Sequence, residues 1–147
     1  MIDGFTKSQG PDIELLIAEM ETKNIKFAIA DKFIKNRVIF YSKEQIIVSR
    51  YRNLNGSVFG FPPYSLYPEY ERMLDNSGEQ PAYIFGDQPS IQVSFEDFLM
   101  THNITFDLRR IGSYALYYNF SSHFNSGDFI VFLRYNGFTY SELLKWL

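Results

Sequence analysis

The sequence predicts a single α/β domain with a mixed, mostly parallel sheet, helices on both faces of that sheet and a C-terminal hairpin. Helical and strand-like segments alternate from residue 12 to residue 102, which is typical of β-α-β units with parallel strands. Two strand-like segments then meet at Ile111-Gly112, as in a tight hairpin. The length of 147 residues suits one domain with a sizeable core.

The first helix is expected to open at Gly10-Pro11-Asp12 and to end at Lys23-Asn24. Proline suits the first position of a helix, and Asp12 and Glu14 would lie near the positive end of its dipole. The apolar residues that follow repeat at helical spacing: Ile13, Leu16, Ile17 and Met20. This helix therefore has one face that can pack against a sheet.

Asp31 stands between a predicted strand, residues 25–30, and a predicted helix, residues 31–41. Its carboxylate can cap that helix, which is a purely structural role. It also lies at the C-terminal end of a strand, where α/β proteins often bind ligands. Both interpretations of Asp31 are kept.

A long aromatic and Pro-rich loop, residues 52–66, is expected after the next strand, residues 45–51. In the helix before that strand, one apolar face is predicted from the spacing of Ile34, Val38 and Tyr41. After the loop, a helix is expected to open near Tyr67-Pro68 and to end at Asn76-Ser77-Gly78, which is a good stop signal.

The second half begins with a strand at 81–85 and a turn at 86–89. Ser94 and Asp97 then resemble a capping box that opens a fourth helix. After the hairpin, residues 128–135 are expected to form another strand. The last predicted element is a helix at 140–147, which a capping box formed by Thr139 and Glu142 would open.

Composition excludes several classes of function. The net charge is −3 and the basic residues are scattered, which argues against a nucleic-acid partner. There is no cysteine, so disulfides, thiolate zinc sites and a cysteine nucleophile are excluded. No apolar run approaches the roughly 18 residues needed to cross a bilayer, and no signal peptide is found, so the chain is expected to be a soluble domain. The 15 Phe and 11 Tyr residues predict an aromatic core with a Tyr-rich surface, and the alternative is a Tyr-rich face for sugars, a partner or a membrane interface.

Motifs for catalysis, metals and cofactors are not found in the sequence. A Gly-rich phosphate loop, HExxH and Gly-x-Ser-x-Gly are all missing. The two histidines, His102 and His123, lie in different predicted elements and are interpreted as packed or solvated side chains. We therefore predict no catalytic residue, no metal and no cofactor.

A binding site is instead predicted at the C-terminal edge of the sheet. Arginine together with tyrosine can hold a phosphate or a sugar by bidentate hydrogen bonds and stacking, although surface pairing with Glu69 and Glu71 is the alternative. The candidate residues come from the strand ends and from the aromatic loop: Asp31, Arg50, Arg52, Phe59, Phe61, Tyr64 and Tyr67.

The order of several motifs resembles a known family. The segments FAIAD with Phe33, NRVIFYSKEQIIVS, YSLYPEY, PAYIF, FEDFLMTHNITF and IGSYALYYNFS follow one another over about residues 12–122. This pattern is similar to the soluble C-terminal region of GT-C-type polytopic membrane glycosyltransferases, the dolichyl-phosphate-mannose protein mannosyltransferase-like group. Leu66 stands where that pattern has an arginine, and residues 123–147 form an extension without a counterpart.

The resemblance implies a non-catalytic accessory domain on the extracytoplasmic side of a membrane. The catalytic carboxylates of such enzymes lie in their membrane part, and their donors are lipid-linked sugars. The implied partners are the membrane-embedded region of the same protein and a glycan or lipid-linked sugar. One alternative is a free-standing small α/β binding protein or enzyme, and another is an interaction module that uses Phe59, Phe61, Tyr64 and Tyr67.

Overall fold

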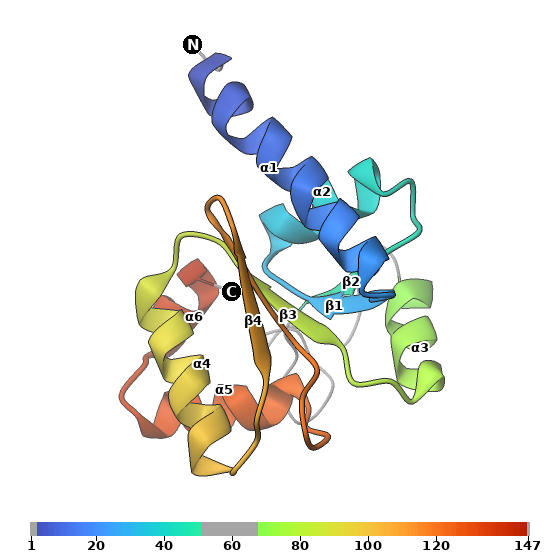
Figure 1. Ribbon diagram of the computed structural model, residues 1–147. Helices are drawn as coiled ribbons and strands as arrows, with labels where there is room; N and C mark the ends of the chain where they lie inside the picture. The colour runs from blue at the N-terminus through green and yellow to red at the C-terminus, as the bar shows by residue number, and fades with distance from the viewer. Residues whose placement is uncertain (1–2, 51–67, 147) are drawn as a thin grey trace.

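The computed structural model describes residues 3–50 and 68–146, and it describes side chains from Asp12 onward except at Pro68, Glu71 and 144–146. The predicted loop at 52–66 lies outside these residues, as do Arg52, Phe59, Phe61, Tyr64 and Tyr67. The helices and strands follow one another in this order: α1 (Asp3–Thr22), β1 (Phe27–Ile29), α2 (Lys32–Tyr41), β2 (Ile47–Ser49), α3 (Pro68–Ser77), β3 (Ala82–Phe85), α4 (Pro89–Thr101), β4 (Asp107–Ile111), β5 (Tyr114–Tyr118), α5 (Ser126–Tyr135) and α6 (Tyr140–Trp146) (Figure 1). They alternate as far as β4.

The strands of the described chain form one sheet in the order β2-β1-β3-β5-β4. β1 pairs in parallel with β2 and β3, whereas β5 pairs antiparallel with β3 and β4. The sheet is thus parallel around β1, and the β4–β5 hairpin extends it on one side. This arrangement confirms the predicted α/β fold class with a mixed sheet in one small domain.

The predicted hairpin turn at Ile111-Gly112 is confirmed, and the backbone conformation of this turn requires a glycine. Gly112 has a φ of +56°, a conformation that strains residues with a side chain. A Cβ atom at this position would also collide with the carboxylate of Asp12 on α1. Asp12 therefore lies against the hairpin turn. The prediction that α1 opens at Gly10-Pro11-Asp12 was wrong, because the helix begins at Asp3.

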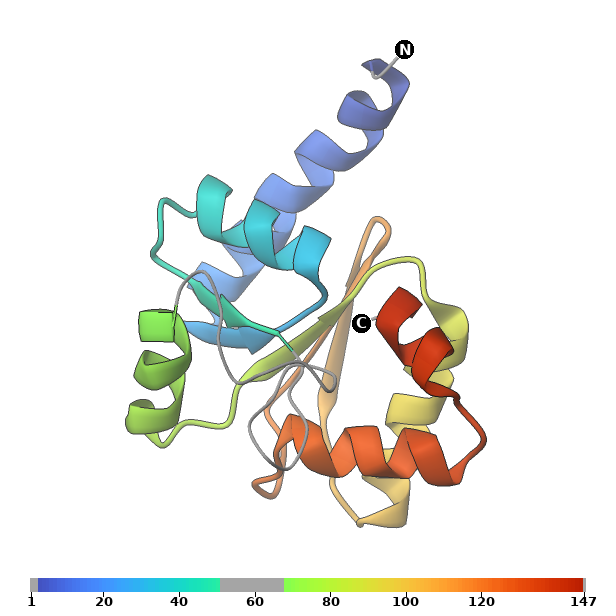
Figure 2. The same ribbon diagram turned by 180° about the vertical axis from the view of Figure 1, so that it is seen from behind.

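α1 and α2 cover one face of the sheet and lie side by side in both views (Figures 1 and 2). On this face the sheet presents three small side chains, Ala28, Ala30 and Ala82, beside the larger Val48, Ile84 and Leu116. Small residues let the helix axes approach the sheet closely, and the helices fill the remaining space with Leu16, Met20 and Val38. The first turns of α1 project beyond the sheet.

The opposite face is covered by α4, α5 and α6, and Leu74 of α3 joins the same core (Figure 1). Here the strands present large rings, Tyr83, Phe85 and Tyr117, none of which is exposed. Phe95 of α4 lies at the centre, with ring centroids 4.8 Å from Tyr83, 5.1 Å from Tyr117 and 5.0 Å from Phe129 of α5. The predicted aromatic core is therefore confirmed on this face.

Two helices begin earlier than their sequences suggested. α1 starts at Asp3 and continues through Pro11, which cannot donate the usual backbone hydrogen bond but does not end the helix here. α4 starts at Pro89, where the ring suits the first helical position, and not at Ser94. Buried Ile91 adds one more turn to the apolar face formed by Phe95 and Phe98.

The prediction of a strand at 128–135 was wrong, because these residues belong to α5. Asn125 and Asp128 form a complete capping box that opens this helix. Phe129, Ile130 and Leu133 are buried at helical spacing. The periodicity of a short apolar run does not distinguish a strand from a helix. Here the capping box and the packing against α4 favour the helix.

Other local predictions were confirmed. Thr139 and Glu142 make the predicted capping contacts at the start of α6. α3 begins at Pro68 and ends at Ser77, followed by Gly78 at a φ of +67°. Tyr41 is an exception, because its side chain is 49% exposed and does not share the buried face of Ile34 and Val38. Among the described residues, no helix combines the length and apolarity that crossing a bilayer requires.

We predict that Phe95→Ala lowers the free energy of unfolding by about 3–5 kcal/mol, because it leaves a cavity that several rings cannot fill. The control is Val93→Ala on the same helix, where the side chain is 61% exposed and the change should stay below about 0.5 kcal/mol. Urea unfolding followed by circular dichroism measures both. Equal losses in the two variants would show that the aromatic cluster is not the centre of the core.

Candidate functional site

The candidate site lies where β1 and β3 run side by side and their chains leave in opposite directions. After β1, the chain passes through α2 to β2 on one side, and after β3 it passes through α4 towards the hairpin on the other. In α/β sheets, such a switch point leaves a crevice at the carboxyl ends of the strands, and ligands bind there. Asp31 follows β1, and Gly86-Asp87-Gln88 follows β3 at this edge.

A hollow of about 490 Å³ is found at this point, and we call it the switch crevice. α2, the β3–α4 connection and the hairpin turn all contribute to its walls. The lining residues are Asp31, Phe33, Ile34, Arg37, Gly86, Asp87, Gln88, Ser113 and Tyr114. The polar groups among them include carboxylates, a guanidinium, an amide, a hydroxyl and a phenol, so the crevice offers both donors and acceptors.

Asp31 performs the structural role that the sequence suggested. Its Oδ1 accepts a hydrogen bond of 2.9 Å from the backbone N–H of Ile34, and this caps α2. Burial raises the pKa of the Asp31 carboxyl above its usual value, while the backbone hydrogen bonds and the charges of Arg37 and Arg50 oppose that rise. Asp31 thus lines the crevice as a partly desolvated carboxyl group beside two cations.

Arg37 connects α2 to the hairpin across the crevice. Its Nη1 donates a 3.3 Å hydrogen bond to the Oη of Tyr114 at the start of β5. These two residues are 77 positions apart in the sequence. This bond holds the guanidinium between α2 and the start of β5, where it lines the crevice.

Arg50, the other described residue of the predicted site, follows β2 and does not line the switch crevice. It lies close enough to Asp31 to affect the pKa of that carboxyl. Its Nε is buried, and no hydrogen-bond partner for it is found within the described ranges. Of the two predicted site residues that the structure describes, Asp31 therefore lines the crevice, and Arg50 interacts with Asp31 electrostatically without lining the crevice.

Sequence reasoning missed Arg37, Asp87, Gln88 and Tyr114. Asp87 and Gln88 were read as part of a turn, although they follow a buried strand as Asp31 does. That position after a strand is the signal that could have identified them. Arg37 and Tyr114 carry no such signal, because they meet only through the packing of α2 beside the hairpin.

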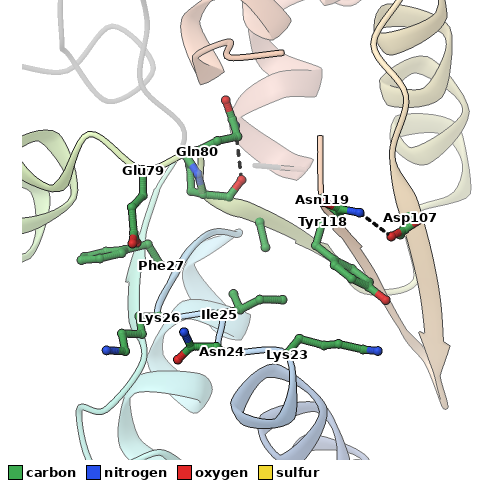
Figure 3. Close-up of a pocket in the computed structure, with 12 residues that line it drawn as sticks. Lys23, Asn24, Ile25, Lys26, Phe27, Glu79, Gln80, Asp107, Tyr118 and Asn119 are labelled. Atoms are coloured by element: carbon green, nitrogen blue, oxygen red, sulfur yellow. Dashed lines mark hydrogen bonds between the residues drawn. The ribbon is translucent and has the colours of Figure 1, made fainter. Parts of the chain in front are cut away.

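A second hollow, of about 590 Å³, lies at the opposite edge of the sheet (Figure 3). It is formed by the connections before β1 and β3 and by the open end of the hairpin. Figure 3 shows the ammonium groups of Lys23 and Lys26 pointing to opposite sides, and the Asn119 amide bonded to Asp107 at 2.9 Å. Its polar groups do not converge on one point, so the larger hollow is the weaker candidate.

Neither histidine lines the switch crevice or the second hollow, and each makes a local contact. His102 is the C-cap of α4, and its Nδ1 lies 2.9 Å from the carbonyl oxygen of Phe98. The Nε2 of His123 lies 3.2 Å from the carbonyl oxygen of Gly78. Among the described residues, no group of three or more His, Asp or Glu side chains is arranged to hold a metal ion.

Replacement of Asp31 separates its capping role from its charge. We predict that Asp31→Ala lowers the stability by about 1 kcal/mol, because the helix loses its cap. Asp31→Asn keeps an acceptor for the Ile34 N–H and removes the buried charge.

The pKa of Asp31 is raised in the folded state, so folding favours the protonated carboxyl. Wild-type stability should therefore fall relative to Asp31→Asn as the pH rises above the ordinary Asp value of 3.8 and through the raised pKa. Urea unfolding between acidic and neutral pH measures this difference. If wild type instead gains stability relative to Asp31→Asn over that range, then Arg37 and Arg50 dominate and the direction of the pKa shift is wrong.

Comparison with known proteins gives no relative for this chain. No protein-family model matches the sequence, no curated protein matches it, and no solved structure matches the fold. The similarity to membrane glycosyltransferases is therefore a resemblance of sequence pattern, and the chemistry of the switch crevice is the main evidence on function.

Proposed function

We propose that this chain is a non-catalytic accessory domain of a membrane glycosyltransferase that uses a lipid-linked sugar, and that it binds a neutral saccharide in the switch crevice. In this proposal the domain lies on the extracytoplasmic side, beside the membrane-embedded region of the same protein. The observation that carries the binding proposal is the convergence of Asp31, Arg37 and Gln88 on one crevice at the switch point of the sheet.

The chemistry of the crevice suits a ligand rich in hydroxyl groups. A sugar hydroxyl both donates and accepts, so it can hydrogen-bond to a carboxylate and to a guanidinium of the same crevice. Phe33 lines the same crevice and is 74% exposed, which leaves its ring face available for the apolar side of a sugar ring. Pockets of this kind combine an apolar surface with a few fixed polar groups.

The charges of the crevice favour a neutral sugar over a phosphate. Asp31 and Asp87 contribute two carboxyl groups to its lining, whereas Arg37 is the one cationic side chain among the lining residues. A phosphate would meet repulsion from these carboxylates, because like charges at short distance are unfavourable. The proposed ligand is therefore the saccharide part of a donor or acceptor, without its phosphate.

Titration of the 147-residue chain with saccharides tests this proposal. We predict that a neutral mono- or disaccharide shifts the backbone NMR signals of residues around Asp31, Arg37 and Gln88. Arg37→Gln should weaken that binding about tenfold or more, because it removes charge-assisted hydrogen bonds. The matched control is Lys23→Gln in the second hollow, which should leave the affinity unchanged.

A thermal-stability measurement must accompany the titration, because Arg37 also bonds to Tyr114. Binding that survives in a folded Arg37→Gln variant, or shifts that cluster around Lys23 and Asn119, would contradict binding at the switch crevice. Tighter binding of a sugar phosphate than of the same free sugar would contradict the argument from charge.

A second candidate is a free-standing binding protein or enzyme that uses the same crevice. The raised pKa of Asp31 favours it, since partly desolvated carboxyl groups in clefts often act in catalysis. Hydrolysis of chromogenic glycosides by the chain, lost in Asp31→Asn, would establish this function and overturn the non-catalytic proposal.

A further inference from the structure

The outer face of α2 carries three exposed aromatic side chains, which we call the aromatic stripe: Phe33, Phe40 and Tyr41. Phe33 and Phe40 are each 74% exposed, and Tyr41 is 49% exposed. Phe33 and Phe40 are seven positions apart, so they lie two turns apart on one side of the helix. Tyr41 packs edge-to-face on Phe40 with a centroid distance of 5.2 Å.

The charge of α2 is opposite to that of the whole chain. The net charge of the chain is −3, yet the sequence of α2, KFIKNRVIFY, has three cations and no acidic residue. Every other helix of the described chain contains at least one Asp or Glu. Exposed Lys32 and Lys43 lie near the two ends of the aromatic stripe, and half-buried Arg37 lies between Phe33 and Phe40. The third cation of α2, Lys35, is buried, and exposed Glu44 follows Lys43 just beyond the helix.

The exposed apolar residues of α4 lack this combination. α4 also exposes two apolar residues seven positions apart, Val93 and Met100. However, exposed Asp97 lies between them on that side of the helix. Isolated exposed apolar residues of this kind are normal on a soluble surface. The aromatic stripe differs from α4, because large rings and cations occur together there. A ring and a cation also meet at the end of α5, where Arg134 lies 4.4 Å from the ring centroid of Tyr140, but Asp128 belongs to that helix.

The stripe is held in place by the fold. Ile34 and Val38, on the inner side of α2, are buried in the core that α1 and the sheet share. Asp31 caps the first turn, and the N–H of Ser42 bonds to the carbonyl of Val38 at the last. The exposed rings are therefore carried by a helix that is fixed at both ends and along its inner side.

We propose that the aromatic stripe docks on a lipid surface that contains anionic headgroups. Aromatic rings are favourable at the boundary between headgroups and acyl chains, and nearby Lys and Arg are attracted to anionic lipids. A second copy of this chain is the less suitable occupant. Two stripes packed face to face would bring Lys32, Arg37 and Lys43 of each copy against the same cations of the other.

Docking through α2 would also bring the switch crevice to the membrane surface. Phe33 and Arg37 belong both to α2 and to the lining of that crevice. If the crevice binds saccharide as proposed above, the sugar of a lipid-linked donor would lie within its reach. The residues that test the lipid proposal, Lys32, Phe40 and Lys43, do not line the crevice, so this proposal can succeed or fail independently of saccharide binding.

Co-sedimentation with vesicles tests the proposal. One set of vesicles contains phosphatidylglycerol and phosphatidylcholine in equal parts, and the other contains phosphatidylcholine alone. We predict that the 147-residue chain binds the anionic vesicles at low salt and that added salt weakens this binding, because salt screens the charges. Phe40→Ser should weaken binding about tenfold through loss of buried apolar area.

Removal of the flanking cations should act through charge. Each Lys near an anionic surface contributes a factor of about five, so Lys32→Gln with Lys43→Gln should weaken binding about 25-fold. The matched controls are Tyr135→Ser, at an 87% exposed aromatic on α5, and Lys23→Gln with Lys26→Gln at the opposite edge of the sheet. These controls should bind like wild type, and thermal unfolding confirms that every variant is folded.

Three outcomes would overturn the proposal. The first is that wild type does not bind anionic vesicles at low salt. The second is that Phe40→Ser and the Lys32/Lys43 variant bind as well as their matched controls do. The third is that Phe40→Ser abolishes a dimer seen by sedimentation velocity while vesicle binding is absent, which would assign the stripe to contacts between copies.

Discussion

The aromatic cluster around Phe95 is the interaction on which the rest of the domain depends. This ring contacts Tyr83 of β3, Tyr117 of β5 and Phe129 of α5, so one side chain connects the centre of the sheet, the hairpin and the C-terminal helices. Aromatic pairs contribute beyond the area that they bury. The cluster explains why the chain is so rich in Phe, and why residues 128–135 are helical once they can pack against α4.

The two faces of the sheet are packed with different kinds of side chain. Towards α1 and α2 the sheet presents three alanines, at positions 28, 30 and 82, with aliphatic Val48, Ile84 and Leu116, whereas towards α4 and α5 it presents the large rings of Tyr83, Phe85 and Tyr117. The switch crevice opens at the carboxyl edge, between these two packing arrangements. The Arg37–Tyr114 hydrogen bond and the contact of Asp12 with the hairpin turn connect the parallel half to the antiparallel half there.

α2 links folding, the crevice and the proposed membrane surface in one helix. Its inner residues, Ile34 and Val38, are buried. Its first turns supply Arg37 to the crevice, next to the Asp31 cap. Its outer residues, Phe40 and Tyr41, remain exposed because they project away from the sheet. A single packing arrangement therefore determines how a saccharide site and a lipid-facing surface would be oriented towards each other.

The sequence by itself determined the fold class, the hairpin turn and the caps formed by Asp31 and by Thr139 with Glu142. These depend on alternation and on residues a few positions apart, which are local properties. It did not determine where α1 and α4 begin, that 128–135 is helical, or which residues line the crevice. Those features depend on contacts between distant segments, such as the 77-residue separation of Arg37 and Tyr114. Such contacts leave no periodic trace in the chain, so only the tertiary structure decided them.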